Sequence, residues 1–480
     1  MSSKLLTQIE TRFPIYPAAV IFAATFYILH VVSLPLRITY DGLGYVDAAD
    51  VLFSARFPHD WLPIRTPLLP LCLKVSWWLL GRQPIATILV MSTAGLAATL
   101  LLGAIMRRVV GDLAGAVALV LVSTSPVLVG YEHSVLTEAG TFFFIALVLY
   151  LTLRDLDDDS GSWYYAALLS VTLGTAYYWR QNILVLGPLA AFIHWRASCR
   201  RAKQIHGRKQ IAAVLQSVVV IVLPPVLTSF WSPYLHQSGL RDVMLRQGMI
   251  KQALLPPEHP YVGQYRDLYF QAIQQSIYQG NYYSGTKWEY LIPLYEKIYV
   301  RPMDRSVPAF FFGLIMHYPA RYLSGLGRSM IHVAGVNGAE SDNRGARAEV
   351  LSPGSKISSG PEPLRARINE EFQQRPAPSA LMPLLRLISP FYDYWVIVAH
   401  FVTLIGLLLA VAWRDMRLLT LCAIPVVYEL GFVLLLASID RFAVPVYPLV
   451  MCNGFVVPLL VYRHMLSRRT AAAKPYPPLP

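Results

Sequence analysis

Long runs of apolar residues, separated by polar connectors, dominate the pattern of this chain. Each run approaches the ~20 residues that an α-helix needs to cross the hydrocarbon core of a bilayer. The pattern therefore predicts an all-α polytopic membrane protein with about ten transmembrane helices. The predicted spans cover residues 17–34, 84–106, 112–130, 139–153, 163–179, 182–196, 210–230, 391–413, 417–437 and 443–462.

Two long stretches between the spans differ from the other connectors in composition. The stretch 35–83 ends in a short, Trp-rich apolar segment at 67–80, a composition typical of a helix lying in the membrane interface. The stretch 231–390 is too polar to lie in lipid, and its early part predicts a helical extracytoplasmic region. Its part 337–379 is rich in Gly, Ser, Pro and charged residues, which predicts a mobile loop. The expected units are an N-terminal transmembrane module at 1–230, an extracytoplasmic subdomain at 231–390, and C-terminal transmembrane helices with a cytoplasmic tail at 391–480.

The charge of the chain agrees with a membrane protein. Charged residues make up 14% of the 480 residues, whereas a soluble domain carries about 25%. The mean hydropathy is +0.45 and the net charge is +13. The Lys and Arg residues concentrate in short connectors, as expected for cytoplasmic loops and contacts with lipid headgroups, so we discount nucleic acid as a partner. The predicted cytoplasmic connectors are 107–108, 154–162, 196–209, 414–417 and 463–469, of which 154–162 is the exception because it carries four Asp residues.

The charged residues that could carry chemistry lie at the outer ends of four predicted hairpins. Charges at membrane depth are costly, so those that face the interior of a bundle are candidates for function. Asp41 fits a general base, because a carboxylate at a dry interface can take a proton from an attacking hydroxyl. The alternative for Asp41 is a solvated carboxylate at the interface with no further role. The other candidates are Glu138, Arg180, Asp440 and Arg441.

Each of these other candidates also has a structural alternative. Glu138 could complement the dipole at a helix start, and the nearby His133 could be a structural histidine. Arg180 follows an aromatic run, so it could be a snorkelling side chain or a clamp for phosphate oxygens. Asp440 and Arg441 could form a salt-bridged helix end, or Arg441 could bind a lipid phosphate.

The motifs around these residues resemble those of a known family. The run Asp41-Gly42-Leu43-Gly44-Tyr45, the run Arg65-Thr66-Pro67-Leu68-Leu69-Pro70-Leu71 and the pattern Arg441-Phe442-x-x-Pro445-x-x-Pro448 are similar to outer-face motifs of GT-C fold glycosyltransferases. That family includes protein O-mannosyltransferases and the lipid A aminoarabinose transferase. The resemblance implies a GT-C-like helical bundle and a polyprenyl-phosphate sugar donor. It also implies inverting transfer, on the non-cytoplasmic face, to a hydroxyl or amine of a lipid, glycan or protein acceptor.

The resemblance assigns roles to residues of this sequence. Asp41 would be the catalytic base and Glu138 a supporting acid of the 1–230 module. Several family members carry a second acid directly after the loop Asp, where this chain has Gly42, so participation of a divalent metal is left open. No organic cofactor is implied. The residues expected to bind substrate are Tyr45, Arg65, His133, Arg180, Asp440 and Arg441.

The location and two alternative functions follow from the same reasoning. A bacterial inner membrane with the site facing the periplasm is expected, although an endoplasmic reticulum location would keep the same geometry. A transporter or flippase for a lipid or small anion would need charges near the bilayer midplane and interrupted helices in matching halves. A polysaccharide polymerase or ligase would rely more on Arg and His in the outer loops.

Overall fold

The computed structural model is helical throughout its described residues, apart from turns and connectors. Extended pairing among those residues is limited to one bridge, between Arg37 and Ser134. This confirms the all-α fold predicted from the apolar runs. The described residues are 14–55, 66–158, 163–202, 208–229, 307–334, 366–368, 370, 372, 381–434 and 443–472.

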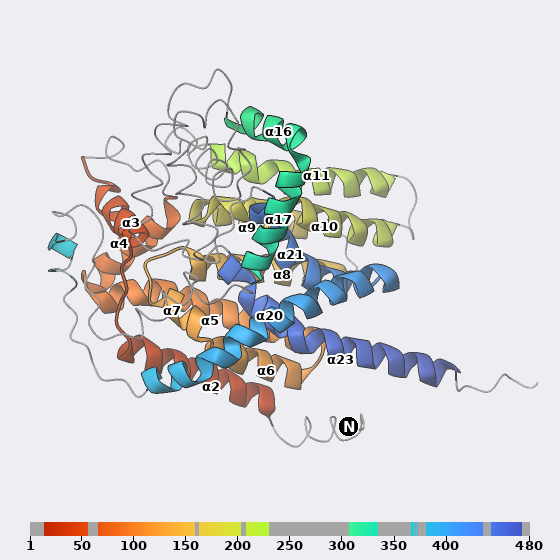
Figure 1. Cartoon of the computed structure of the whole chain (residues 1–480), viewed down its shortest axis with the longest axis horizontal. Helices are drawn as coiled ribbons and strands as arrows, with labels where there is room; N and C mark the ends of the chain where they lie inside the picture. Colours follow the sequence, from red (N-terminus) through yellow and green to blue (C-terminus); the bar gives the residue numbers. More distant parts are fainter. Residues whose placement is uncertain are drawn as a thin grey trace, which may run out of the picture.

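Helices of the N-terminal half follow one another closely along the chain. They are α2 (Ile15–Ser33), α3 (Tyr40–Val51), α4 (Leu68–Leu80), α5 (Pro84–Val109), α6 (Asp112–Ser123), α7 (Pro126–Glu132), α8 (Glu138–Asp157), α9 (Trp163–Trp179), the 3₁₀ helix η1 (Gln181–Leu186), α10 (Gly187–Ala202) and α11 (Arg208–Ser229). The long helices lie side by side along the longest axis of the molecule, with α3 and α4 at one end (Figure 1). Helix α5 packs against α6 and α8, and α9 packs against α11.

The C-terminal helices complete the bundle. They are α16 (Val307–His317), α17 (Pro319–Val333), α20 (Leu381–Trp413), α21 (Met416–Val433), the 3₁₀ helix η3 (Val444–Val446) and α23 (Tyr447–Ala472). Helix α17 crosses the direction of the long helices and packs on α21 (Figure 1). Helix α20 packs on both α21 and α23. It begins at Leu381, ten residues before the predicted span 391–413.

Among the described residues, six helices are long and apolar enough to cross a membrane: α2, α5, α8, α20, α21 and the helix that runs from η3 into α23. The predicted number of about ten spans is therefore not confirmed, although each predicted span coincides with a described helix. The expected span 112–130 is a bent pair, because α6 and α7 meet at 59°. Pro126 follows the break; its ring excludes the helical conformation from the residue before it and removes a backbone donor. Counting the pair as one span gives seven.

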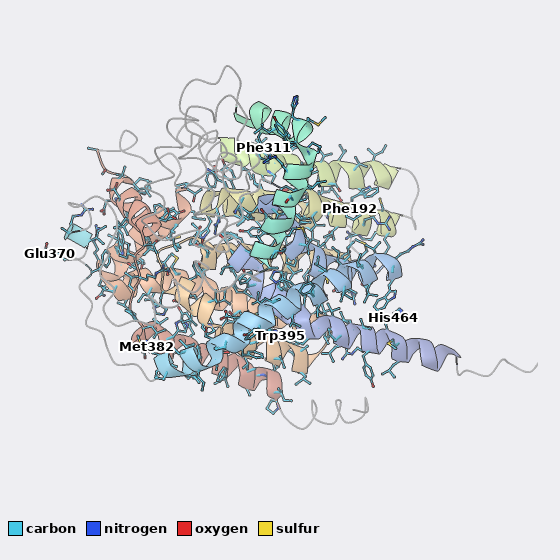
Figure 2. The ribbon with its side chains drawn as sticks, in the orientation of Figure 1. Phe192, Phe311, Glu370, Met382, Trp395 and His464 are labelled. Carbon is cyan, nitrogen blue, oxygen red and sulfur yellow. The ribbon has the colours of Figure 1, made fainter. Side chains whose placement is uncertain are left out.

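The predicted cytoplasmic connectors gather at the end of the bundle opposite α3 and α4, which we call the inner end. Asp157 accepts hydrogen bonds from Arg108, at 2.7 Å, and from Arg417. His464 stacks on the last residue of α20, with ring centroids 4.1 Å apart. Figure 2 shows Glu370 beside α3 and α4, and His464 at the opposite side of the molecule. Acidic residues of 154–162 thus neutralise the basic residues of neighbouring connectors, which explains the exception in the charge pattern.

A buried polar cluster ties α8, α10 and α11 together near the inner end. Asp155 is fully buried and lies 2.7 Å from Nδ1 of His194 and 2.8 Å from Nη2 of Arg201. The other ring nitrogen of His194 lies 3.2 Å from Oε1 of Gln216. A buried carboxylate with a cation and a histidine around it keeps its charge compensated, so this cluster is a structural lock between three helices.

The end that carries α3 and α4, which we call the outer end, has its own ion pairs. Asp50 accepts a bidentate pair from Arg82, whose second bond measures 3.1 Å, and a further bond of 2.8 Å from Arg367. The Arg82 guanidinium lies over the ring of Trp77, which in turn packs on Phe372 with centroids 6.1 Å apart. The segment that holds Arg367 and Phe372 is therefore docked on the first outer loop. The rest of the predicted mobile part 337–379 falls outside the described residues.

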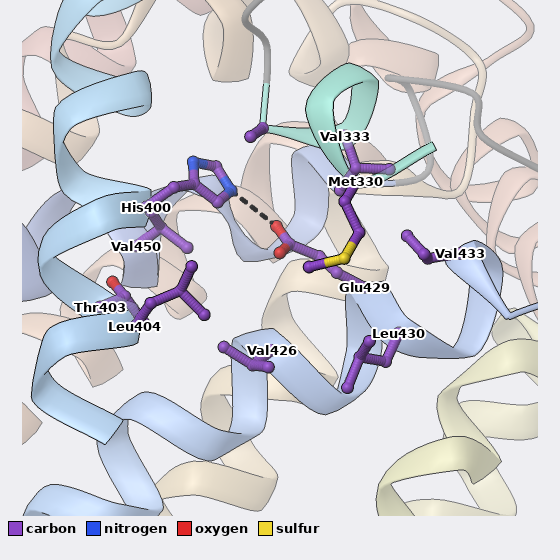
Figure 3. Close-up of a pocket in the computed structure, with 11 residues that line it drawn as sticks. Met330, Val333, His400, Thr403, Leu404, Val426, Glu429, Leu430, Val433 and Val450 are labelled. Carbon is purple, nitrogen blue, oxygen red and sulfur yellow. Dashed lines mark hydrogen bonds and ion pairs between the residues drawn. The ribbon is translucent and has the colours of Figure 1, made fainter. Parts of the chain in front are cut away.

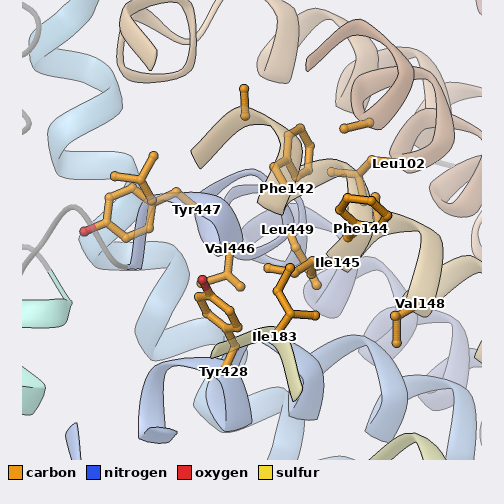
Figure 4. Packing of buried hydrophobic residues seen from close by; sticks show 14 of the residues in the cluster. Leu102, Phe142, Phe144, Ile145, Val148, Ile183, Tyr428, Val446, Tyr447 and Leu449 are labelled. Atoms are coloured by element: carbon orange, nitrogen blue, oxygen red, sulfur yellow. The ribbon is translucent and has the colours of Figure 1, made fainter. Parts of the chain in front are cut away.

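The most extensive of several hydrophobic clusters among the described residues lies between the two ends. Figure 4 shows aromatic and branched side chains from α5, α8, η1, α21, η3 and α23 in mutual contact. Phe142 and Phe144 of α8 belong to this core, and so do Ile183 of η1 and Tyr428 of α21. Burial of these side chains fixes the first turn of α8 against η1 and α21, directly beneath the outer end.

Candidate functional site

Asp41 lies in the first turn of α3, where it is half-buried. Thr39 caps this helix, because its side-chain oxygen accepts a hydrogen bond of 3.1 Å from the backbone N–H of Gly42. An acid in the first turn also complements the positive end of the helix dipole. Gly42 lies so close to the next segment that a β-carbon there would be 3.0 Å from the carbonyl oxygen of Val135. The start of α3 is thus pressed against the segment that leads into α8.

A short extended link joins α2 to α3 and pairs with that same segment. The backbone N–H of Arg37 donates to the carbonyl of His133 at 2.7 Å, and the N–H of Val135 donates to the carbonyl of Arg37 at 3.1 Å. These two bonds form the bridge between Arg37 and Ser134. The bridge holds two segments that are far apart in the sequence side by side. Asp41 follows Arg37 by four residues, and Glu138 follows Ser134 by four residues.

Glu138 and Arg180 meet as an ion pair at the outer end. Glu138 is the first residue of α8 and is 2% exposed. Arg180 connects α9 to η1, and its Nη1 lies 3.1 Å from Oε1 of Glu138. The Glu138 side chain is buried and that of Arg180 is 12% exposed, so the pair is largely shielded from water and its electrostatic attraction is stronger than at an open surface. Tyr428 of α21, at the edge of the core, interacts electrostatically with both residues.

Trp179 fixes the position of the arginine that follows it. Its indole N–H donates to the carbonyl of Thr137 at 2.8 Å, and its own carbonyl accepts a bond of 2.6 Å from the hydroxyl of Thr66. The indole packs directly over Gly140, where a β-carbon would come within 2.0 Å of the ring. Thr66 lies just before α4, within the first outer stretch 35–83, so three separate hairpins converge around Trp179 and Arg180.

The remaining predicted site residues are placed differently. Tyr45 is buried in the core cluster, with 8% exposure. His133 is fully buried, and its ring nitrogens face His30 and the carbonyl of Pro35, so the structural alternative accounts for its position. Arg65, Asp440 and Arg441 lie outside the described residues.

A metal site at the outer end would need several His, Cys, Asp or Glu side chains close together. No group of three or more His, Cys, Asp and Glu side chains that could hold a metal ion occurs within the described parts of the chain. Gly42, at the position where several family members carry a second acid, packs against the Val135 backbone. Because this position is a glycine, the start of α3 supplies Asp41 without a second adjacent acid, so the described residues there do not fit a two-acid metal site.

A cavity of about 70 Å³ lies between α17, α20, α21 and α23. Figure 3 shows that its walls are mostly apolar and that His400 and Glu429 meet inside it. Nε2 of His400 lies 2.8 Å from Oε1 of Glu429, and the other ring nitrogen lies 2.7 Å from the carbonyl oxygen of Val396. The sequence analysis missed this pair. Its signal was a lone His and a lone Glu within two apolar runs, 391–413 and 417–437.

The described helices and this outer end define a class: an all-helical, multi-pass membrane protein with a buried acid paired to an arginine at the end of the bundle that carries α3 and α4. Residues 64–228, about a third of the chain, match the family described as dolichyl-phosphate-mannose-protein mannosyltransferase. The match includes Glu138 and Arg180 and begins after Asp41. It supports a glycosyltransferase with a GT-C fold and confirms the resemblance noted in the sequence.

Other comparisons add a distant structural likeness. The chain is similar to the archaeal oligosaccharyltransferase AglB from Archaeoglobus fulgidus, solved in complex with an inhibitory peptide and a dolichol-phosphate. The TM-score is 0.41 and the sequence identity 12%, over 97% of this chain and 52% of that chain. This chain thus spans about half the length of AglB. No curated protein matches it.

Proposed function

We propose that this chain is a membrane glycosyltransferase that moves a sugar from a polyprenyl-phosphate donor to a hydroxyl or amine of a lipid, glycan or protein. The family match over residues 64–228 supports this class of reaction. The observation that carries the proposal is the placement of the start of α3 against the segment that leads into the Glu138–Arg180 pair. This arrangement collects an acid and a cation from distant hairpins at one end of the bundle.

The proposed chemistry needs little more than these groups. A sugar on a lipid phosphate already has a good leaving group, so the protein must deprotonate the acceptor and stabilise the charge of the departing phosphate. Asp41 would take the proton while the acceptor attacks the anomeric carbon from the face opposite the phosphate, which inverts the configuration.

Arg180 would receive the phosphate. Its guanidinium carries five N–H donors, more than one carboxylate can accept, so pairing with Glu138 is compatible with binding phosphate oxygens. Glu138 would then orient the guanidinium rather than react itself. This refines the supporting role that the resemblance implied for Glu138, since its buried carboxylate lies 3.1 Å from the Arg180 guanidinium.

The proposed site faces the non-cytoplasmic side. The charge pattern supports this orientation, since the basic connectors that are expected in the cytoplasm meet at the inner end. A bacterial inner membrane with the site open to the periplasm fits this orientation.

The decisive experiment compares two aspartates of the same helix. Asp41→Asn and Asp47→Asn are purified in membranes and supplied with a radiolabelled polyprenyl-phosphate sugar. Loss of a general base should lower transfer by Asp41→Asn at least ~100-fold. Asp47, also half-buried on α3, is the matched control and should keep its transfer rate. Full activity of Asp41→Asn, at an unchanged protein level, would remove Asp41 as the base.

A lipid or small-anion flippase is the second candidate function, and one observation favours it. His400 and Glu429 form an ion pair inside two candidate spans, and intramembrane ionisable residues often mark a transport path. From the sequence, charged residues with a functional role were expected only at the outer ends of the predicted hairpins. The two functions differ in a direct readout, because a flippase moves labelled lipid across a vesicle membrane without transferring sugar.

A further inference from the structure

A chain of buried polar groups runs between α7, α2 and the link that leads to Asp41. Oε2 of Glu132 lies 3.1 Å from Nε2 of His30, and Nδ1 of His30 lies 3.0 Å from Nε2 of His133. Nδ1 of His133 then lies 3.2 Å from the carbonyl oxygen of Pro35. All three side chains are at least nine-tenths buried. The sequence analysis named only His133 among them.

The donors and acceptors among these hydrogen-bonded groups can be assigned by starting from the Pro35 carbonyl. A carbonyl only accepts, so Nδ1 of His133 must carry the proton that points at Pro35. In neutral His133 the other nitrogen accepts, so Nδ1 of His30 must carry a proton as well. The gap between His30 and Glu132 then needs one more proton, which makes the pair either imidazolium and carboxylate or two neutral groups. Three protons therefore fill three gaps. Those on Nδ1 of His30 and Nδ1 of His133 both point toward Pro35, and the third points the same way when the Glu132–His30 pair is neutral.

The hydrogen-bonded groups end at Pro35, which belongs to the link that precedes α3. His133 is bonded to this link twice, through its ring to Pro35 and through its carbonyl to Arg37. The backbone N–H of Val135 adds a third bond, to the carbonyl of Arg37. Two residues further, Val135 supports Gly42, the neighbour of Asp41. The ring of His133 can make its contact only in the tautomer and orientation that His30 imposes.

We propose that His30, Glu132 and His133 are positioning residues for Asp41. Their shared proton chain holds the link 34–39 against the segment 133–135 and thereby sets where the carboxylate of α3 lies. This inference rests on the proposed function for its catalytic consequence, but the positioning itself is a structural claim. None of the three side chains touches substrate, because they are buried behind the link.

The surroundings of the chain contain few other titratable groups. From α2, Tyr27 interacts electrostatically with Glu132 and hydrogen-bonds Thr93 of α5 at 3.1 Å. Ser92 of α5 lies 3.3 Å from the Glu132 carbonyl. The Glu132 side chain packs against Gly95, where a β-carbon would come within 2.0 Å of it. The acid thus has a fitted space, and His30 is its hydrogen-bonded partner.

A disulfide reports the positioning directly. A β-carbon at Gly42 would lie 3.3 Å from that of Val135, just below the usual range of about 3.5–4.5 Å in disulfides. The parent for the test is therefore Gly42→Cys with Val135→Cys, and the measurement is the rate of disulfide formation, read by peptide mass spectrometry. The single-cysteine variants control for pairing with the four native cysteines. A parent that forms no disulfide would contradict the contact and overturn the proposal.

Three changes in this parent test the proton chain. The double change His30→Phe with Glu132→Met removes both partners together, which avoids leaving a buried charge alone. It should slow disulfide formation at least about tenfold, as expected when a buried group loses its hydrogen bond. Glu132→Gln can donate to neutral His30 and so should keep the parent rate. His194→Phe removes a comparable buried histidine at the inner end and should also keep it.

The activity arm separates this proposal from the proposed function. In the chain without new cysteines, the double change should lower kcat/KM for sugar transfer about 100-fold, the effect of a misplaced catalytic group. Glu132→Gln alone should keep most of the wild-type kcat/KM, because the amide can still donate to neutral His30. A disulfide rate that the double change leaves unaltered overturns the positioning role whatever happens to activity. Absence of transfer by the unmodified protein, with the expected disulfide rates, would sink the proposed function and leave the positioning role standing.

Discussion

Gly140→Ala is a sharp perturbation of the outer end, because it adds one methyl group beneath Trp179. The new β-carbon would lie 2.0 Å from the indole ring, and ordinary contact begins at 3.4 Å, so the ring must retreat by about 1.4 Å. Such a movement breaks the 2.8 Å hydrogen bond from the indole N–H to Thr137. It also moves the residue that directly precedes Arg180.

The magnitude follows from three contributions. Overpacking a close-packed site costs about 1–3 kcal/mol. Loss of the indole hydrogen bond costs about 1 kcal/mol more. Alanine favours a helix interior over glycine by about 1 kcal/mol, which offsets the lost bond. We therefore expect the free energy of unfolding to fall by about 1–3 kcal/mol, although alanine is the better helix former.

Activity should fall further than stability. Displacement of Trp179 carries Arg180 away from Glu138, and a misplacement of about 1 Å at a reacting centre can cost about 100-fold in rate. The assays are thermal unfolding in detergent and sugar transfer in membranes. Gly327→Ala in α17 is the control, because nothing lies within 4 Å of its added β-carbon. A Gly140→Ala protein as stable and as active as wild type would refute the packing of Trp179 described above.

Two further predictions concern buried ionisable groups. Burial, and then the neighbouring His30, lower the pKa of His133 to about 3; this residue follows α7 and lies outside the candidate spans. The unfolded chain therefore binds more protons than the folded one between pH 3 and 6.5, so stability should fall by about 2 kcal/mol from pH 7 to pH 5. The same loss in His133→Gln, measured by thermal unfolding at both pH values, would show that other groups cause it. For Glu429, the transferase proposal predicts that neither wild type nor Glu429→Gln moves labelled lipid across proteoliposomes; wild-type transport that Glu429→Gln abolishes would favour the flippase.

The helices were predictable because lipid imposes a simple rule on the sequence. A backbone that crosses hydrocarbon must satisfy its own hydrogen bonds, so apolar length reports a helix directly. Each predicted span coincides with a helix for this reason. Length does not report bends, however, and the break between α6 and α7 depends on Pro126. It also does not report where a helix ends in water, which is why α20 begins ten residues before its predicted span, at Leu381.

The charge pattern predicted on which side of the membrane each connector lies, but not which charged residues pair with one another. The sequence treated the four Asp residues of 154–162 as a weak exception to a rule about Lys and Arg. The structure gives two of them specific partners, because Asp155 faces Arg201 and Asp157 faces Arg108. Such pairs join connectors that are tens of residues apart, and no local pattern encodes which connector meets which.

The candidate site was predictable in part for the same reason. Acids and arginines at helix ends are visible in a sequence, and Asp41, Glu138 and Arg180 were found in this way. That Glu138 holds Arg180, and that Val135 supports the start of α3, depends on tertiary packing. His30 gave no signal, because one histidine near the end of an apolar run resembles any interfacial polar residue.

Three histidine–carboxylate pairs share a feature that only the fold reveals. The pairs join α2 to α7, α8 to α10, and α20 to α21, and each is buried. Lipid is as apolar as leucine, so the hydrophobic effect does not select which helices of a membrane bundle face one another. A buried polar pair does select, because any other register leaves a charge in hydrocarbon, where it is costly. Removing such a pair from the inner end should therefore loosen helix register there, whereas removing the pair beside the link 34–39 should displace the one element that carries Asp41.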